Sequence, residues 1–201
     1  LPCGVDTTRF RPLPRVAART RLGLDPAGRY LLFPADPARP EKRHDRARAI
    51  ARSVGAELLT LGSVDPDDVP WWVNAANAVV IPSEREGFGL AVLEALACDV
   101  PVLATPVGIA PLALDGLAGA HCGTFDVERW STALAPQLDA ADPRVAGRPR
   151  AELFSAERMA ARVAVAWRAL ADEAGGSRSG RRYTRRRSVA VQTGDVTPTN
   201  R

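Results

Sequence analysis

The sequence has 201 residues, of which 46% are hydrophobic and 25% are charged, a balance that is typical of globular proteins and excludes wholesale disorder. No uncharged stretch is longer than fifteen residues, and the one at residues 100–114 contains three prolines, so no transmembrane helix is predicted. The three cysteines lie far apart without a C-x-x-C pair, which favours neither a disulfide framework nor a zinc site. We therefore expect a metal-free protein of the reducing cytoplasm.

The isoelectric point of about 9.5 is a property of one end of the chain. From Gly175 onward there are seven arginines and one acid, a net charge of +6, so the preceding residues carry −2 of the total of +4. A slightly acidic body without interleaved aromatic and basic residues is not typical of a nucleic-acid-binding domain. We expect no specific nucleic-acid partner.

The two ends differ in composition from the middle of the chain. Residues 1–28 begin with a turn-rich, proline-rich segment that is typical of an interdomain linker, and we therefore expect a further domain before Leu1. Residues 175–201 are rich in Gly, Ser and Arg and lack a hydrophobic period, which predicts a disordered basic tail. The tail is either a solvated extension or a segment that docks on acidic lipid head groups.

Residues 29–174 alternate between short β-rich runs and stretches with a helical period. Strands are predicted at residues 30–35, 56–61, 78–81, 101–104 and 119–122, and helices at residues 41–54, 69–76, 88–98, 127–138 and 156–173. This alternation predicts an α/β fold with a Rossmann-like parallel sheet and helices on both faces. Ligands of such folds lie outside the carboxyl ends of the strands, so the loops after the strands are the places to search.

The loop after the third strand begins the segment PSEREGFGLAVLEAL, residues 82–96. A glycine-bearing loop that turns directly into a helix leaves unpaired N–H groups at the positive end of a helix dipole, where phosphate-like anions bind. Gly87 and Gly89 allow the backbone to approach such a ligand closely. A dinucleotide-binding G-x-G-x-x-G pattern is excluded because Val92 stands at its third glycine.

Two acids in this segment are candidate ligand contacts. Glu94 is the only charged residue between Gly87 and Cys98, in a helix whose composition predicts burial nearly all round. A carboxylate in that setting needs hydrogen-bond donors, and sugar hydroxyls in a cleft are suitable. Alternatively, Glu94 marks a narrow solvent-facing edge. Glu86 lies in the loop that the same ligand would contact, or is an ordinary surface acid.

The loop after the first strand contains a basic cluster that includes Arg39, Lys42 and Arg43. This loop opens on the same edge of the sheet as the loop after the third strand, so the cluster can face an anion held there. Lys42 is the only lysine among 27 basic residues, which favours a specific use of its compact ammonium over a random surface position. His44 is expected to be an ordinary residue of the first helical turn.

Three segments resemble the retaining glycosyltransferases of family 4. Residues 82–108, PSEREGFGLAVLEALACDVPVLATPVG, resemble the E-x7-E region of that family, with Glu86 and Glu94 at its acidic positions. Cys3-Gly4-Val5-Asp6 and the following Phe-Arg-Pro resemble the linker into the family's second domain, and residues 33–45 resemble its basic phosphate loop. The likeness runs from residue 1 to about residue 171, and Asp99 stands where the family usually has glycine.

The resemblance implies a GT-B fold, of which this chain is the C-terminal half, and a nucleotide-diphosphate sugar donor with no metal or other cofactor. By analogy, Glu94 binds the ribose, Glu86 contacts the transferred sugar, and Lys42 neutralises the diphosphate that backbone amides also hold. Glu86 and Lys42 are the expected catalytic residues. The predicted donor-binding residues are Arg39, Lys42, Arg43, Glu86, Gly87, Phe88, Gly89, Leu90 and Glu94.

The predicted function is the transfer of a sugar with retention of configuration, in polysaccharide or glycoconjugate biosynthesis. The missing N-terminal domain would supply the acceptor pocket, so this chain alone is expected to bind donor weakly and to transfer little sugar. A nucleotide-sugar epimerase and a non-catalytic nucleotide-sugar-binding module tethered by the arginine tail are the alternatives. The expected location is the cytoplasm, with peripheral attachment to the inner face of the membrane as an alternative.

Overall fold

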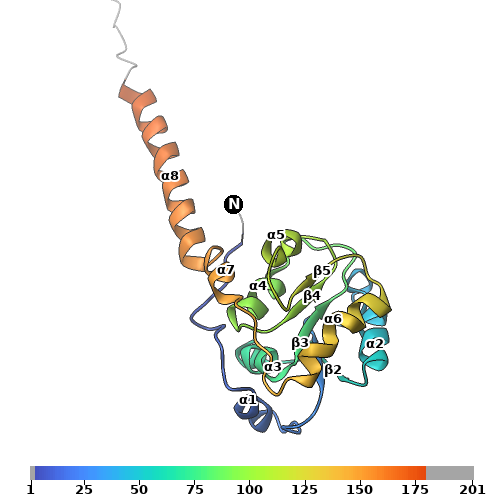
Figure 1. Cartoon of the computed structure of the whole chain (residues 1–201). Coiled ribbons are helices and arrows are strands. Elements are labelled where there is room, and N and C mark those ends of the chain that lie inside the picture. Colours follow the sequence, from blue (N-terminus) through green and yellow to red (C-terminus); the bar gives the residue numbers. More distant parts are fainter. Residues whose placement is uncertain (1–2, 180–201) are drawn as a thin grey trace, which may run out of the picture. The chain divides into compact units, whose positions relative to one another are not determined.

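The computed structural model describes residues 3–179, and its centre is one parallel sheet. The strands stand in the order β2-β1-β3-β4-β5 (Figure 1). Their bounds are β1 Tyr30–Phe33, β2 Glu57–Thr60, β3 Ala78–Ile81, β4 Val102–Ala104 and β5 His121–Cys122. All five predicted strands are present, and the predicted Rossmann-like α/β fold is confirmed. The chain order reverses between β1 and β3, so the crevice at their carboxyl ends is the place where this architecture binds ligands.

Successive side chains of the central strands point to opposite faces of the sheet, and helices cover both faces. Leu31 and Phe33 pack in one buried cluster, whereas Leu32 and Val79 pack in the other. The first cluster includes residues of α2 (His44–Ser53) and α6 (Val127–Asp139), and the second includes residues of α3 (Val69–Ala75), α4 (Leu90–Ala97) and α5 (Ala110–Leu114). Burial on both faces explains why the strands are continuous apolar runs.

The helix predicted over residues 41–54 is two elements in the structure. A 3₁₀ helix, η1 (Pro40–Lys42), is followed by Arg43 with φ 56° and ψ 54°, and α2 begins only at His44. Pro40 favours the first turn of a helix, but the left-handed conformation of Arg43, at the end of η1, interrupts the α-helical hydrogen bonding. The prediction of one continuous helix is therefore wrong at its start, and Lys42 lies on a separate short element.

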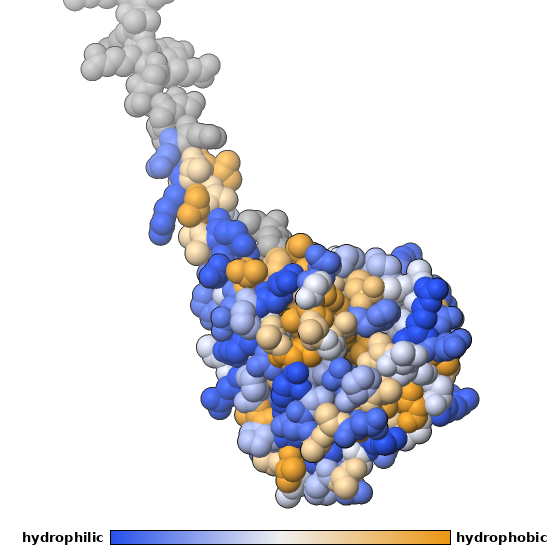
Figure 2. Space-filling model, viewed as in Figure 1, coloured by the Kyte–Doolittle hydropathy of each residue, from blue (hydrophilic) through white to orange (hydrophobic). Residues whose placement is uncertain are grey.

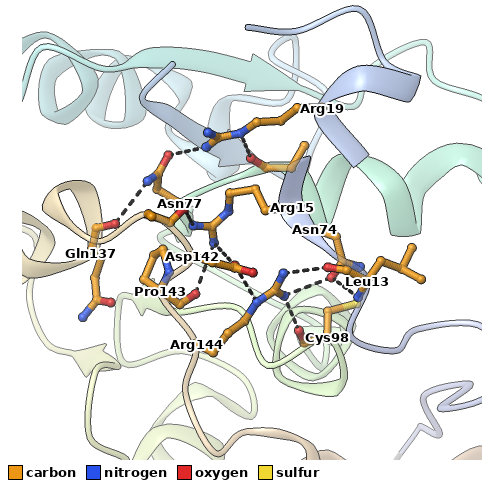
Figure 3. Close-up of polar contacts among 12 residues, drawn as sticks. Leu13, Arg15, Arg19, Asn74, Asn77, Cys98, Gln137, Asp142, Pro143 and Arg144 are labelled. Carbon is orange, nitrogen blue, oxygen red and sulfur yellow. Dashed lines mark hydrogen bonds and ion pairs between the residues drawn. The ribbon is translucent and has the colours of Figure 1, made fainter. Parts of the chain in front are cut away.

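The predicted linker over residues 1–28 contains a helix, α1 (Arg15–Arg21). Arg15 and Arg19 are only 2% and 3% exposed, and their guanidinium groups donate to backbone carbonyls of other segments (Figure 3). Arginine counts as a surface residue in a hydrophobic pattern, so the pattern does not reveal this helix. Two further short helices, α5 and α7 (Arg148–Glu152), were likewise absent from the prediction.

Arg144 joins three segments that are distant in sequence. Its guanidinium donates to the carbonyl of Leu13 at 2.7 Å, to the carbonyl of Cys98 at 2.8 Å and to Asn74 Oδ1 at 3.0 Å (Figure 3). The same group pairs with Asp142 at 2.8 Å. Because these acceptors belong to the N-terminal segment, to α3 and to the end of α4, Arg144 fixes the N-terminal segment on the sheet domain.

The surface of the sheet domain mixes apolar and charged groups on the face shown in Figure 2. The exposed large apolar side chains of this compact unit, which ends at Val163, are Val16, Leu90, Leu112, Val127 and Leu153. Scattered exposed apolar groups are ordinary for a folded domain.

The last helix, α8 (Ala156–Ser179), enters a second compact unit that begins at Ala164. The helix α8 includes residues 175–179, which are the first residues of the predicted basic tail. The rest of the predicted disordered tail, residues 180–201, lies outside the described residues. Within the described residues, no helix is long and apolar enough to cross a membrane.

Candidate functional site

A cavity of about 230 Å³ lies at the carboxyl ends of β1 and β3, where the strand order reverses. Its walls come from the loop after β1, from η1, from the loop after β3 and from α4. The lining residues are Phe33, Pro34, Ala35, Lys42, Ile81, Ser83, Glu86, Gly89, Leu90, Ala91 and Glu94. Five of the residues predicted from sequence, namely Lys42, Glu86, Gly89, Leu90 and Glu94, are therefore brought together.

The floor of the site is the turn from the β3 loop into α4. Gly89 precedes α4 with φ 93° and ψ 47°, a left-handed conformation that a residue with a side chain rarely adopts. Among residues 3–179, no side chain caps the start of this helix. The first N–H groups of an uncapped helix are available to an anion and carry the positive end of the helix dipole. The backbone at this turn is thus suited to receive a phosphate-like group.

Lys42 and Glu86, which both line the cavity, form an ion pair. The Lys42 Nζ donates to Glu86 Oε2 at 2.6 Å, and the two side chains are only 13% and 10% exposed. The loops that carry them are also joined through the backbone, because the Glu84 N–H donates to the Glu41 carbonyl at 2.9 Å. An ammonium and a carboxylate therefore lie side by side in the lining of the cavity.

Glu94 lies on α4 and faces the cavity between buried neighbours. Leu93 and Ala95 on either side of it are fully buried, whereas Glu94 is half-buried and lines the cavity. Burial raises the pKa of the Glu94 carboxyl above its ordinary value, and the positive charge of Arg9 offsets part of that effect. The carboxylate is thus held in a partly desolvated position where hydroxyl donors of a ligand would be favourable partners.

Four of the residues predicted to bind the donor lie outside the lining of the cavity. Arg39 pairs with Glu41 at 2.6 Å, and Arg43 pairs with Asp45 and Glu84. Both arginines line a separate hollow of the surface. Gly87 is exposed and Phe88 is half-buried, its carbonyl accepting from the Ile109 N–H at 2.7 Å. None of these four residues lines the cavity.

Two residues that shape the site escaped the prediction. Ser83 lines the cavity and donates its hydroxyl to Glu86 Oε1 at 2.7 Å. Gly108, after β4, has φ 59°, and a side chain there would lie 2.5 Å from the Phe88 carbonyl oxygen and 3.0 Å from Glu86 Cβ. Their positions in the loops after β3 and β4 were the available signal, because both loops open on the edge of the sheet where ligands of such folds lie.

Asp99, which replaces the usual glycine of the family, has φ 56° and so adopts the conformation that favours glycine. Its carboxylate accepts from the backbone N–H groups of Gly147 at 3.1 Å and Arg148 at 2.7 Å. Aspartate tolerates the left-handed region better than most residues, and here its side chain also binds the start of α7. The aspartate thus takes the backbone conformation of the glycine and adds hydrogen bonds to the start of α7, and it lies outside the cavity lining.

Comparison with known families assigns the chain to a group of enzymes. The family model described as "Glycosyl transferases group 1" matches residues 16–139. The D-inositol 3-phosphate glycosyltransferase of Mycolicibacterium gilvum is 34% identical to this chain, with 92% of this chain and 51% of that protein covered. The chain spans about half the length of the curated relatives it matches.

Solved structures share the fold. Sucrose-phosphate synthase from Thermosynechococcus elongatus superposes with a TM-score of 0.66 at 23% identity, covering 86% of this chain and 52% of that one. A protein from Anabaena, solved in complex with UDP and glucose, superposes with a TM-score of 0.63 at 17% identity, covering 82% and 55%. The fold is that of a domain of the GT-B glycosyltransferases, and the match of the family model settles membership: the chain belongs to the glycosyl transferases group 1 family.

Proposed function

We propose that this chain is the donor-binding part of a retaining glycosyltransferase of family 4, which transfers a sugar from a nucleotide-diphosphate sugar to an acceptor. The observation that carries the proposal is the convergence of Lys42, Glu86, Gly89 and Glu94 on one cavity at the reversal point of the sheet. Membership of the glycosyl transferases group 1 family supports transfer over the epimerase and binding-module alternatives. The Anabaena structure in complex with UDP and glucose supports a nucleotide-sugar ligand.

Each side of the cavity suits a different part of the donor. Glu94 would accept hydrogen bonds from the ribose hydroxyls, because its half-buried carboxylate has few other partners and gains donors on binding. The backbone amides at the start of α4 would hold the diphosphate. Glu86 would contact the transferred sugar, and Lys42 would meet the charge of the diphosphate.

The chemistry of sugar transfer explains why these groups are charged as they are. As the bond to the diphosphate breaks, positive charge develops on the sugar ring and negative charge grows on the leaving phosphate. A fixed ammonium and a helix N-terminus stabilise the leaving group, and a carboxylate near the ring stabilises the developing cation. The Lys42–Glu86 pair, at 2.6 Å, thus holds one group for each charge in the lining of the cavity.

Binding of the donor requires the Lys42–Glu86 ion pair to rearrange. The Lys42 ammonium has to turn from Glu86 toward the diphosphate. It thereby exchanges a carboxylate partner for a group with more negative charge. Glu86 then keeps its charge next to the sugar. Within this proposal no metal ion or other cofactor is needed, since the ammonium and the helix dipole supply the positive charge.

The remaining parts of the proposal concern partners and location. A separate domain of the kind that the relatives contain would supply the acceptor site, consistent with coverage of about half of each relative. The enzyme would act in the cytoplasm in polysaccharide or glycoconjugate biosynthesis, and the seven arginines from Arg178 onward would attach it to acidic lipid at the inner face of the membrane. We propose no specific nucleic-acid partner.

Calorimetric titration of the chain with UDP, GDP and ADP, and with the parent nucleosides, tests the proposal directly. We expect one diphosphate to bind measurably more tightly than its nucleoside, and the Glu94→Ala variant to lose affinity for both. Absence of binding by all three diphosphates would contradict the proposal. A Glu57→Ala variant, in which an exposed carboxylate of β2 is removed, is the matched control and should bind as the unaltered chain does.

A further inference from the structure

Ser83, at the beginning of the β3 loop, is in contact with the machinery of the site but has no role in the proposed chemistry so far. The residue is 2% exposed, and its hydroxyl donates to Glu86 Oε1 at 2.7 Å. A serine hydroxyl has a single hydrogen to donate, and here that hydrogen bond goes to one defined partner. Here the partner is the carboxylate that stands closest to Lys42.

Ser83 is itself held firmly by the neighbouring strand. The hydroxyl of Thr105, which follows β4 and is 5% exposed, donates to the Ser83 carbonyl and to the Ile81 carbonyl. The Thr105 backbone N–H donates to the Ile81 carbonyl at 3.0 Å. These bonds fix the backbone on both sides of Pro82, so the Ser83 hydroxyl projects from a rigid edge of the sheet.

The two oxygens of Glu86 have different partners. Oε1 accepts from the hydroxyl of Ser83, whose backbone is fixed to the sheet. Oε2 accepts from the ammonium of Lys42, which lies at the end of a long side chain with four rotatable bonds. When a diphosphate draws the ammonium away, only the bond to Ser83 continues to orient the carboxylate. A carboxylate without that bond would be free to follow the ammonium, because the ion pair is the strongest contact left to it.

We propose that Ser83 is a positioning residue, which keeps the Glu86 carboxylate directed at the transferred sugar while Lys42 turns to the diphosphate. The inference rests on the proposed function, since it assumes that the cavity binds a nucleotide-diphosphate sugar. It assigns to Ser83 an effect on the sugar part of the donor and none on the nucleotide part.

Titration of the 201-residue chain with UDP and with UDP-glucose, or with the corresponding pair if GDP or ADP binds better, tests this inference. We expect Ser83→Ala to weaken binding of the nucleotide sugar by about tenfold, the loss typical of a hydrogen bond to a charged group. Binding of the diphosphate alone should change by less than about twofold. Ser155→Ala is the matched control, because Ser155 is also buried but lies at the start of α8, and both affinities should be unchanged.

A second pair of variants separates positioning from support of the fold. Ser83→Cys keeps a polarisable group at the same position but has only a weak S–H donor, and it should reproduce the loss even if Ser83→Ala is unstable. In a Glu86→Ala background, Ser83→Ala should change the ratio of the two dissociation constants by less than about twofold, because the serine then has nothing to orient.

The outcomes distinguish this inference from the proposal beneath it. Equal weakening of UDP and UDP-glucose by Ser83→Ala, or the same tenfold loss in the Glu86→Ala background, would overturn the role of Ser83 while leaving the donor site intact. Failure of the unaltered chain to bind any diphosphate or nucleotide sugar would instead overturn the proposed function.

Discussion

The pairing of Lys42 with Glu86 raises the question of what each charge contributes to binding. Lys42→Ala should weaken binding of a nucleoside diphosphate by about 1.5 to 3 kcal/mol, the usual loss for a charge-assisted hydrogen bond. Affinity for the nucleoside should change much less, because the nucleoside lacks the diphosphate. Titration with both ligands measures the difference, and Arg52→Ala, on α2 outside the cavity lining, is the control. Equal losses for both ligands would mean that Lys42 supports the fold instead.

Glu94 leads to a prediction about pH and stability. Its pKa is raised by burial, so between its ordinary pKa, near 4.5, and the raised value the folded state binds more protons than the unfolded state. The free energy of unfolding therefore falls as pH rises through that interval. Glu94→Gln removes this dependence, so the variant should gain stability relative to the unaltered chain as pH rises from about 4 to 7.

Chemical denaturation of the two ligand-free proteins at several pH values measures the effect. Glu57→Gln, which alters an exposed carboxylate of β2, should show no comparable trend. A stability difference between Glu94→Gln and the unaltered chain that does not vary with pH would show that the desolvation of Glu94 is not felt in the folded state.

At the scale of elements, α7 is attached to the sheet domain by a few defined hydrogen bonds. The Asp99 carboxylate accepts from two N–H groups at its start, and the Arg148 guanidinium donates to the carbonyls of Thr7, Phe10 and Ala97. α7 therefore connects the end of α4 to the N-terminal segment, as Arg144 does just before it in the chain.

Asp99→Ala should lower the free energy of unfolding by roughly 1 to 3 kcal/mol, because it removes the acceptor and leaves alanine in a left-handed conformation. Asp99→Asn keeps an acceptor oxygen and tolerates that conformation, so its cost should stay below about 1 kcal/mol. Denaturant titration measures both values. If asparagine proved as damaging as alanine, the negative charge rather than the hydrogen-bond geometry would be the important property of Asp99.

The elements differ in how far the sequence predicts them. β3 has the predicted bounds because AVVI is a continuous apolar run, the pattern of a strand buried on both faces. α1 was missed because its buried residues include Arg15 and Arg19, whose burial depends on carbonyl acceptors from distant segments. The break at Arg43 also depends on tertiary contacts, since its side chain pairs with Glu84 in the β3 loop.

At the scale of the whole molecule, the cavity lies at an open edge of the sheet domain. Sugar transfer requires an acceptor site and exclusion of water, which closure of an active site normally provides. We therefore expect the 201-residue chain to bind nucleoside diphosphate but to transfer little or no sugar. Joining it to an acceptor domain of the kind found in its relatives should restore turnover, measured as glycosylated acceptor. Robust transfer by the chain alone would contradict this expectation.

The residue pattern was enough to predict the parallel sheet, the edge of the sheet where the cavity lies, and the places of Glu86 in the β3 loop and Glu94 on the helix that follows. These features are local or follow from the right-handed connection of β-α-β units, so they can be predicted from the order of apolar, polar and glycine residues along the chain. The residue pattern could not show that Lys42 lines the cavity whereas Arg39 and Arg43 do not, or that the Ser83 hydroxyl donates to Glu86; the folded structure shows both. The direction of a side chain depends on partners from other strands and loops, and those partners meet only when the sheet has formed.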